Sequence, residues 1–150
     1  MYKVIKDTRE QQGWWFPESE ECGGTVVSKL DSGDYSIEGY EKVFSIERKR
    51  NTGEFAMNMF EKRFVAELER LESYEHSFLI LEFSYDDLMR FPEGSGIPSN
   101  KWKRLKATPK MLISFLNRID LTYKTKIIFA PYNGQERAAD LFKYFLKLYG

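Results

Sequence analysis

The sequence predicts an α/β fold in which a central mixed β-sheet is flanked by helices on both faces. Segments of strand length dominate the first third of the chain, and helical periodicity then alternates with short apolar runs. The composition, 42% hydrophobic and 31% charged, is typical of a folded protein and excludes disorder. With 150 residues, we expect a single domain over residues 1–150.

The first third of the chain is expected to form a strand meander. Residues 2–7 (YKVIKD) read as the first strand, and the β-branched residues 25–30 follow a turn-rich segment. Ser32-Gly33-Asp34 is a turn signal, and a second turn is expected around Gly39. The remaining strands are predicted at residues 35–37 and 43–49.

Helical periodicity begins after this meander. One broad apolar face consists of Phe60, Phe64, Ala66, Leu68 and Leu71. The nearly continuous apolar run that follows, SFLILEF at residues 77–83, is typical of a buried central strand.

The last third is expected to contain two helices and one strand. A helix is predicted at 109–121, with Thr108 as its N-cap and Pro109 in its first position. A buried strand at 126–130 and a final helix at 135–148 follow. Residues 90–107 have no regular pattern and are too long for a simple connection, which indicates a functional or mobile segment.

The charge balance limits the function classes. The chain has 23 basic and 23 acidic residues and one histidine, so a protein that coats nucleic acid without selectivity is disfavoured. A single cysteine, Cys22, excludes a disulfide scaffold and a cysteine-based zinc site. No apolar run is long enough for a membrane helix, and the N-terminus resembles no signal peptide, so we expect a cytoplasmic protein and no membrane partner.

Acidic and basic side chains gather where the predicted strands end. Residues two apart on a strand share a face, so Glu47 and Lys49 should project together and Arg48 to the other side. Asp34 would add a carboxylate from the adjoining strand, and Asp7 another. Such carboxylates hold a divalent cation, and the lysine orients or deprotonates water or neutralises a phosphate. Taken singly, however, each pattern is more common as a surface ion pair or a turn.

Three motifs lie at the predicted strand ends: DTREQ at residues 7–11, LDSGDYS at 30–36 and IERK at 46–49. Together they resemble the XPF-type nuclease domain of the PD-(D/E)xK nuclease superfamily. The resemblance continues through RFVAELERL at 63–71, the strand at 79–83 and residues 127–148, so it covers nearly the whole chain. It implies a restriction-endonuclease-like three-layer fold.

The resemblance also implies site residues and a reaction. Asp7, Asp34 and Glu47 would form the site for Mg²⁺ (or Mn²⁺), and Lys49 would be the catalytic lysine. The supporting active-site residues would be Arg9, Glu10 and Arg48. The implied reaction is metal-dependent hydrolysis of DNA phosphodiester bonds, often at junctions between single-stranded and double-stranded DNA.

The sequence departs from the family pattern in two respects. Family members often carry an Asp four residues after the lysine, where this chain has Gly53 followed by Glu54. Either Glu54 substitutes for that carboxylate or the carboxylate is missing. Many members also carry a helix-hairpin-helix domain, which we do not expect here, and this leaves junction specificity and homodimer formation open.

A basic segment is the predicted DNA-binding element. No acidic residue lies between Glu93 and Asp120, and an aromatic side chain stands among the bases of this stretch. We expect the phosphate backbone to be held by Lys101, Trp102, Lys103, Arg104 and Lys106. The alternative is a solvated loop with Trp102 folded onto the core. Residues 54–75, with six acids and three bases, are expected to face away from DNA.

The sequence therefore predicts a metal-dependent DNA endonuclease from a bacterial cytoplasm or a phage-infected cell. One alternative is a non-catalytic scaffold that binds DNA or protein, although such members lose the acidic and Glu-Arg-Lys residues retained here. Another is a resolvase-like recombination nuclease. His76 and Cys22 are expected to be incidental. Trp14 and Trp15 are expected to serve in core or rim packing, with a wedge that inserts into DNA as the alternative.

Overall fold

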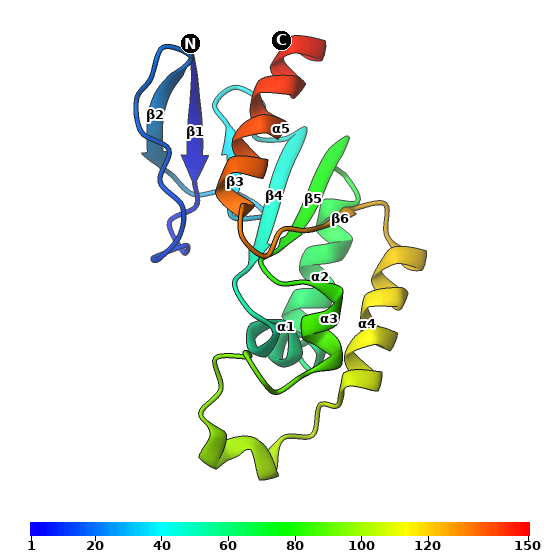
Figure 1. Cartoon of the computed structure of the whole chain (residues 1–150). Coiled ribbons are helices and arrows are strands. Elements are labelled where there is room, and N and C mark those ends of the chain that lie inside the picture. The colour runs from blue at the N-terminus through cyan, green and yellow to red at the C-terminus, as the bar shows by residue number, and fades with distance from the viewer.

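The computed structural model describes residues 1–150 and contains one six-stranded mixed sheet in the order β2-β1-β3-β4-β5-β6 (Figure 1). The strands β4, β5 and β6 are parallel, and β3 is antiparallel to both of its neighbours, β1 and β4. The strands are β1 (Tyr2–Lys6), β2 (Cys22–Val27), β3 (Tyr35–Ile37), β4 (Phe44–Lys49), β5 (His76–Leu81) and β6 (Lys126–Phe129).

Helices cover both faces of the sheet, which confirms the three-layer α/β fold (Figure 1). The helices are α1 (Thr52–Met59), α2 (Lys62–Leu71), α3 (Tyr85–Met89), the 3-10 helix η1 (Ser99–Arg104), α4 (Pro109–Thr122) and α5 (Gly134–Tyr149). None of them combines the length and the apolar character needed to cross a bilayer.

The core divides into two clusters because β5 alternates between the two faces of the sheet. Leu79 and Leu81 pack with apolar side chains of α1, α2 and α4. Phe78 and Ile80 point the other way and pack with α5 and with the aromatic residues that follow β1. A strand buried on both faces explains the nearly continuous apolar run that the sequence shows there.

The expected meander is wrong in one respect: β2 lies outside β1 and runs parallel to it. The connection between them carries Trp14 and Phe16, which are buried against Tyr35 and Phe142 on one face of the sheet. Because these rings pack on the sheet, the connection returns to the end of the sheet where β1 begins. Strand β2 therefore runs in the same direction as β1. Strand β3 then fills the place between β1 and β4.

Two short helices were not predicted. The sequence of α1, TGEFAMNM, contains poor helix formers, and the helix depends on Asn51, whose side-chain oxygen accepts from the Glu54 N–H at 2.8 Å. Phe60, expected on an apolar helix face, ends α1 and is exposed. The five-residue α3 is fixed by a capping box between Ser84 and Asp87, and no periodicity can develop over so few residues.

The strand register sets three acidic residues in one row across the sheet. Lys6 pairs with Tyr35, and Tyr35 pairs with Ile46. In antiparallel pairs the next residues are also opposite one another, so Asp7 lies beside Asp34 and Asp34 beside Glu47. The Asp7 N–H accordingly donates to the Asp34 carbonyl at 2.8 Å. Topology alone thus collects the carboxylates at one edge of the sheet.

The turn that places Asp34 requires glycine at position 33. Gly33 has a φ of +85°, and a Cβ there would lie 2.0 Å from Ser45 Oγ. Gly39 also has a positive φ, +92°, but no atom lies within 4 Å of the place that its Cβ would take. Substitution of Gly39 would therefore cost backbone strain alone, whereas substitution of Gly33 would cost backbone strain and a steric clash with Ser45.

We predict that Gly33→Ala destabilises the protein more than Gly39→Ala does. The left-handed backbone costs an alanine about 1–2 kcal/mol at either site, and overpacking against Ser45 adds about 1–3 kcal/mol at position 33 only. Urea unfolding of both variants measures the difference. Equal losses of unfolding free energy would mean that Ser45 is not packed against this turn.

Candidate active site

A polar cavity of about 330 Å³ opens at the edge of the sheet where the acidic row lies. Its walls come from the ends of β1 and β4, the turn before β3, and the helices α1 and α2. The charged or amide side chains that line it are Asp7, Arg9, Asp34, Glu47, Lys49, Glu54, Asn58, Arg63, Glu67 and Arg70. A larger cavity, about 710 Å³, lies between β6 and α5, but most of its lining is apolar.

Glu47 and Lys49 form a buried ion pair inside this cavity. Lys49 Nζ lies 2.8 Å from Glu47 Oε2, and the residues are only 7% and 3% exposed. The ammonium group also lies 4.5 Å from the centre of the Phe64 ring. Burial excludes an ordinary surface ion pair. The second oxygen of Glu47, Oε1, is buried and has no hydrogen-bond partner.

Asp34 crowds Glu47 from the neighbouring strand. Its Oδ2 accepts from the Arg48 backbone N–H at 2.8 Å, which fixes the carboxylate beside the Glu47–Lys49 pair. Desolvation by the surrounding protein raises the pKa of Asp34 to about 7. Burial, together with the charge of Asp34, raises the pKa of Glu47 to about 8. Two neighbouring carboxylates that share the charge of only one ammonium thus create a site that favours additional positive charge.

Asp7, the third acid of the row, is already engaged by donors. Its Oδ1 accepts from the Leu30 N–H at 2.7 Å, and its Oδ2 accepts from Arg9 Nε at 2.7 Å. Burial would raise the pKa of Asp7, but Arg9 and the backbone donors outweigh it and hold the pKa below its usual range. Asp7 is therefore ionised, and its carboxylate is turned toward Arg9.

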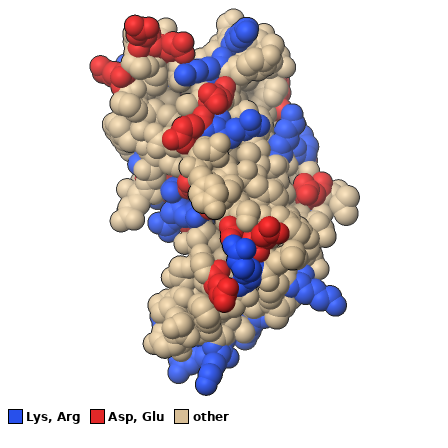
Figure 2. All heavy atoms as spheres, in the orientation of Figure 1, with Lys and Arg blue, Asp and Glu red and all other residues tan.

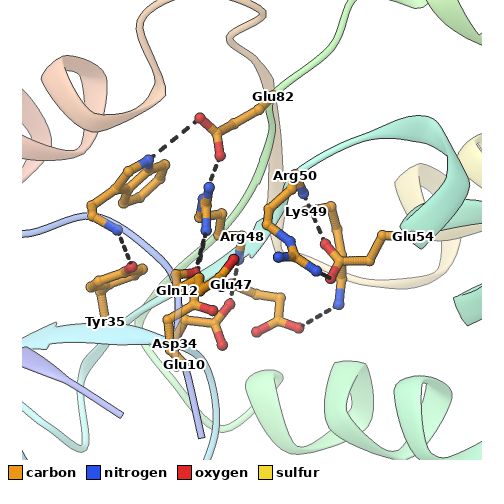
Figure 3. A network of polar contacts seen from close by, with 11 residues as sticks. Glu10, Gln12, Asp34, Tyr35, Glu47, Arg48, Lys49, Arg50, Glu54 and Glu82 are labelled. Atoms are coloured by element: carbon orange, nitrogen blue, oxygen red, sulfur yellow. Dashed lines mark hydrogen bonds and ion pairs between the residues drawn. The ribbon is translucent and has the colours of Figure 1, made fainter. Parts of the chain in front are cut away.

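Arg48 and Glu10 lie outside the cavity, although the sequence groups them with the site. The Arg48 side chain points to the opposite face of the sheet from Glu47 and Lys49 (Figure 3). It pairs with Glu82 and, at 3.4 Å, with Glu10, and it lies 5.2 Å from the Trp14 ring centre. Arg48 thus anchors the segment after β1, while its backbone N–H orients Asp34.

Gly53, at the position where family members often carry an Asp, packs closely against Ser95 and leaves no room for a side chain. A Cβ at Gly53 would lie 2.4 Å from the Ser95 carbonyl oxygen, which accepts the Gly53 N–H. Glu54 reaches the cavity wall, but its carboxylate accepts from the Arg50 N–H at 2.8 Å and pairs with the Arg50 guanidinium at 3.5 Å. Glu54 therefore has its own basic partner on the rim.

Helix α2 contributes a polar stripe that the sequence analysis missed. Arg63, Glu67 and Arg70 line the cavity, so part of the segment 54–75, which is expected to face away from DNA, faces the candidate site. Glu67 Oε1 accepts from the Gly33 N–H at 3.1 Å, and burial together with the charge of Glu47 raises the pKa of Glu67 to about 7. These three residues are spaced by four and then three positions, which puts them on one helix face, so this spacing could have identified the stripe from the sequence.

The basic segment at 101–106 does not line the cavity. Its lysines and arginine are exposed around η1, and the charged side chains visible at that end of the molecule in Figure 2 are all basic. Trp102 is half-buried, and its Nε1 donates to the Ile97 carbonyl at 2.9 Å. The loop meets α1 through the hydrogen bond from the Gly53 N–H to the Ser95 carbonyl and then extends away from the sheet (Figure 1).

Three of the other singled-out residues, His76, Cys22 and Trp14, serve in packing. His76 packs against the rings of Phe145 and Tyr149, and Cys22 is buried in the core. Trp14 is buried, whereas Trp15 is 52% exposed near the Lys6 ammonium.

The donor chemistry of the cavity fits a hard divalent cation. Carboxylate and amide oxygens are the ligands such cations prefer, and two unpartnered buried oxygens, Glu47 Oε1 and Asn58 Oδ1, belong to cavity residues. No three acidic, histidine or cysteine side chains converge closely enough to form a complete cage, in keeping with the turn of Asp7 toward Arg9. Of the three acids in the row, Asp34 and Glu47 are those that could hold such a cation without first breaking an ion pair with an arginine.

The mixed sheet, its flanking helices and the position of the cavity define a fold of the restriction-endonuclease-like nuclease class. The ERCC4 domain matches residues 7–145, so the chain belongs to the ERCC4 domain family, whose members are typically structure-specific, metal-dependent DNA endonucleases. This confirms the family that the three motifs indicate.

Solved structures of XPF from Aeropyrum pernix share the fold. One of them aligns over 97% of this chain with a TM-score of 0.60 and 20% sequence identity. The other, a complex with DNA, aligns over 98% of this chain with a TM-score of 0.64 and 21% sequence identity. This chain spans 60% and 66% of the length of those chains. No curated protein sequence matches it.

We predict that the metal-free protein loses stability as the pH rises from about 5 to 9. The raised pKa values mean that Asp34, Glu47 and Glu67 hold protons in the native state that the unfolded chain releases. Their contribution to the free energy of unfolding is fully present below the pKa of the unfolded chain. It is lost as the pH rises through the higher pKa of the native state. Urea unfolding in EDTA at successive pH values measures this slope.

The slope should be smaller in Asp34→Asn, which removes the carboxylate that crowds Glu47. Asp86→Asn, at an exposed position on α3, is the matched control and should keep the wild-type profile. An unfolding free energy that is constant or rises over this range would contradict the crowding of the carboxylates.

Proposed function

We propose that this protein is a divalent-metal-dependent endodeoxyribonuclease that hydrolyses phosphodiester bonds in branched or flap DNA. The observation that carries the proposal is the buried Glu47–Lys49 pair beside Asp34, in a cavity open to solvent. Membership of a family of DNA endonucleases supports the reaction class. The DNA complex of the Aeropyrum pernix protein supports DNA as the substrate.

In this proposal Asp34 and Glu47 hold Mg²⁺ or Mn²⁺, and Asp7 joins them by turning from Arg9. When bound, the cation polarises a phosphodiester oxygen and lowers the pKa of a water molecule. The cavity residues fit this role through the unpartnered Oε1 of Glu47 and the crowding of the two carboxylates.

Lys49 acts as a charged donor. Burial alone would lower its pKa, but the charge and hydrogen bond of Glu47 outweigh burial and raise the pKa above its ordinary value. The ammonium group therefore stays protonated at neutral pH, and it neutralises phosphate charge or orients the attacking water. Removal of a proton from that water falls to another group. A protonated lysine thus favours orientation of the water or neutralisation of the phosphate over deprotonation of the water by Lys49.

The roles of the other site residues follow from their contacts. Arg9 orients Asp7 through the contact at 2.7 Å. Arg48 orients Asp34 through its backbone N–H and, with Glu10, secures the segment after β1 from the opposite face. These three are supporting residues, because none of their side chains reaches the Glu47–Lys49 pair.

We predict that Lys49→Ala lowers cleavage of DNA by at least about 100-fold, the usual cost of losing one preorganised charge-stabilising donor. The test uses single-stranded, duplex, flap and four-way DNAs with Mg²⁺, Mn²⁺ or EDTA. Wild-type cleavage should require the metal. Lys147→Ala, at an exposed lysine on α5, is the control and should cleave normally.

Full cleavage by folded Lys49→Ala would contradict the mechanism. Binding without cleavage of any DNA by the wild type would instead favour a non-catalytic scaffold. Preferential cleavage of the four-way DNA would identify a resolvase-like nuclease.

We propose that Lys101, Trp102, Lys103, Arg104 and Lys106 make a second, outer contact with DNA. Four exposed bases without an intervening acid suit a phosphate backbone that leaves the cavity along this loop. Replacement of all four basic residues by glutamate (K101E, K103E, R104E and K106E) is therefore expected to weaken DNA binding and to reduce the dependence of the affinity on salt concentration. Unchanged affinity and salt dependence in a fluorescence-anisotropy titration would remove the loop from the interface.

A further inference from the structure

Three arginines line the cavity, and only one of them lacks an acidic partner. Arg9 is paired with Asp7, and Arg63 is paired with Glu61 at 2.5 Å. Arg70, at the end of the α2 stripe, has no carboxylate within ion-pair distance. A phosphate that approaches Arg70 therefore meets a guanidinium with no ion pair to break.

Arg70 is nevertheless held in place. Its Nε donates to Ser32 Oγ at 2.9 Å, and Ser32 is 2% exposed. The Ser32 carbonyl in turn accepts from Ser45 Oγ at 3.1 Å, so the anchor is part of the turn that positions Asp34. The two terminal nitrogens of the guanidinium take part in no protein hydrogen bond. A planar group with free donors and a fixed orientation is suited to a phosphate.

The position of Arg70 relates it to the acidic row. Glu67 lies three residues earlier on the same face of α2, less than one turn of about 5.4 Å along the axis. Glu67 accepts a hydrogen bond from the Gly33 N–H, and Glu67 and Glu47 line the same cavity. A phosphate at Arg70 would therefore be a neighbour of the phosphate that contacts a cation held by Asp34 and Glu47, on a DNA strand that crosses α2.

We propose that Arg70, oriented by Ser32, binds the DNA backbone phosphate next to the one that is cleaved. The inference rests on the proposed nuclease function, because it takes DNA as the substrate of this cavity. It places the DNA strand across α2, beside the turn between β2 and β3. The outer loop at 101–106 then contacts a more distant part of the DNA.

The test measures DNA binding in Ca²⁺ over a series of salt concentrations, with no cleavage step. Arg70→Gln is expected to weaken binding of flap and duplex DNA alike by about 10-fold and to reduce the salt slope by about 1, because one phosphate contact is lost. Arg118→Gln is the matched control, since Arg118 is exposed on α4, away from the cavity, and should leave both quantities unchanged.

Ser32→Ala separates binding from a structural role, because it frees Arg70 without removing its charge. Its affinity should fall less than that of Arg70→Gln, with a wild-type salt slope. A wild-type slope in Arg70→Gln, with only lower thermal stability, would overturn the proposal. If the wild type binds DNA but cleaves none with Mg²⁺ or Mn²⁺, the nuclease proposal fails while the slope still decides the role of Arg70.

Discussion

The site depends on the burial of two carboxylates, Asp34 and Glu47, with a single ammonium group, Lys49, for compensation. Burying a charge is costly unless it is paired, and here the pairing is incomplete. The metal-free fold relieves the imbalance by raising the pKa values of the two carboxyls, so that they hold protons to higher pH, while the Arg48 backbone N–H holds Asp34 in place. A divalent cation or a phosphate-bound metal would complete the neutralisation.

The topology of the sheet produces this crowding. The insertion of β3 between β1 and β4 aligns Asp7, Asp34 and Glu47 across three adjacent strands. The same arrangement gives the two faces of β4 different roles, because Glu47 and Lys49 enter the cavity whereas Arg48 fastens the segment that covers the opposite face. The tripeptide Glu47-Arg48-Lys49 thus contributes two residues to the site on one face and one residue to the packing of the N-terminal third on the other.

The sequence predicted the fold class, the family and five of the six strand positions closely, because alternation along strands and three contiguous motifs are local signals. It missed the place of β2, which depends on burial of Trp14 and Phe16 far from the strand itself. It also missed Glu67 and Arg70, because counting charges over residues 54–75 ignores which face of α2 carries each one. The filling of the space at Gly53 by Ser95 is a contact between distant segments that no local pattern reports.

Calorimetric titration of the DNA-free protein with Mn²⁺ tests the central claim most directly. The wild type should bind the cation, and Asp34→Asn and Glu47→Gln should each lose at least about 10-fold in affinity, as expected when an oxygen ligand is removed. Glu54→Gln should bind almost normally, because Glu54 is paired with Arg50 in the same cavity. Unchanged affinity in Glu47→Gln, or an equal loss in Glu54→Gln, would contradict the assignment of the buried pair as the metal site.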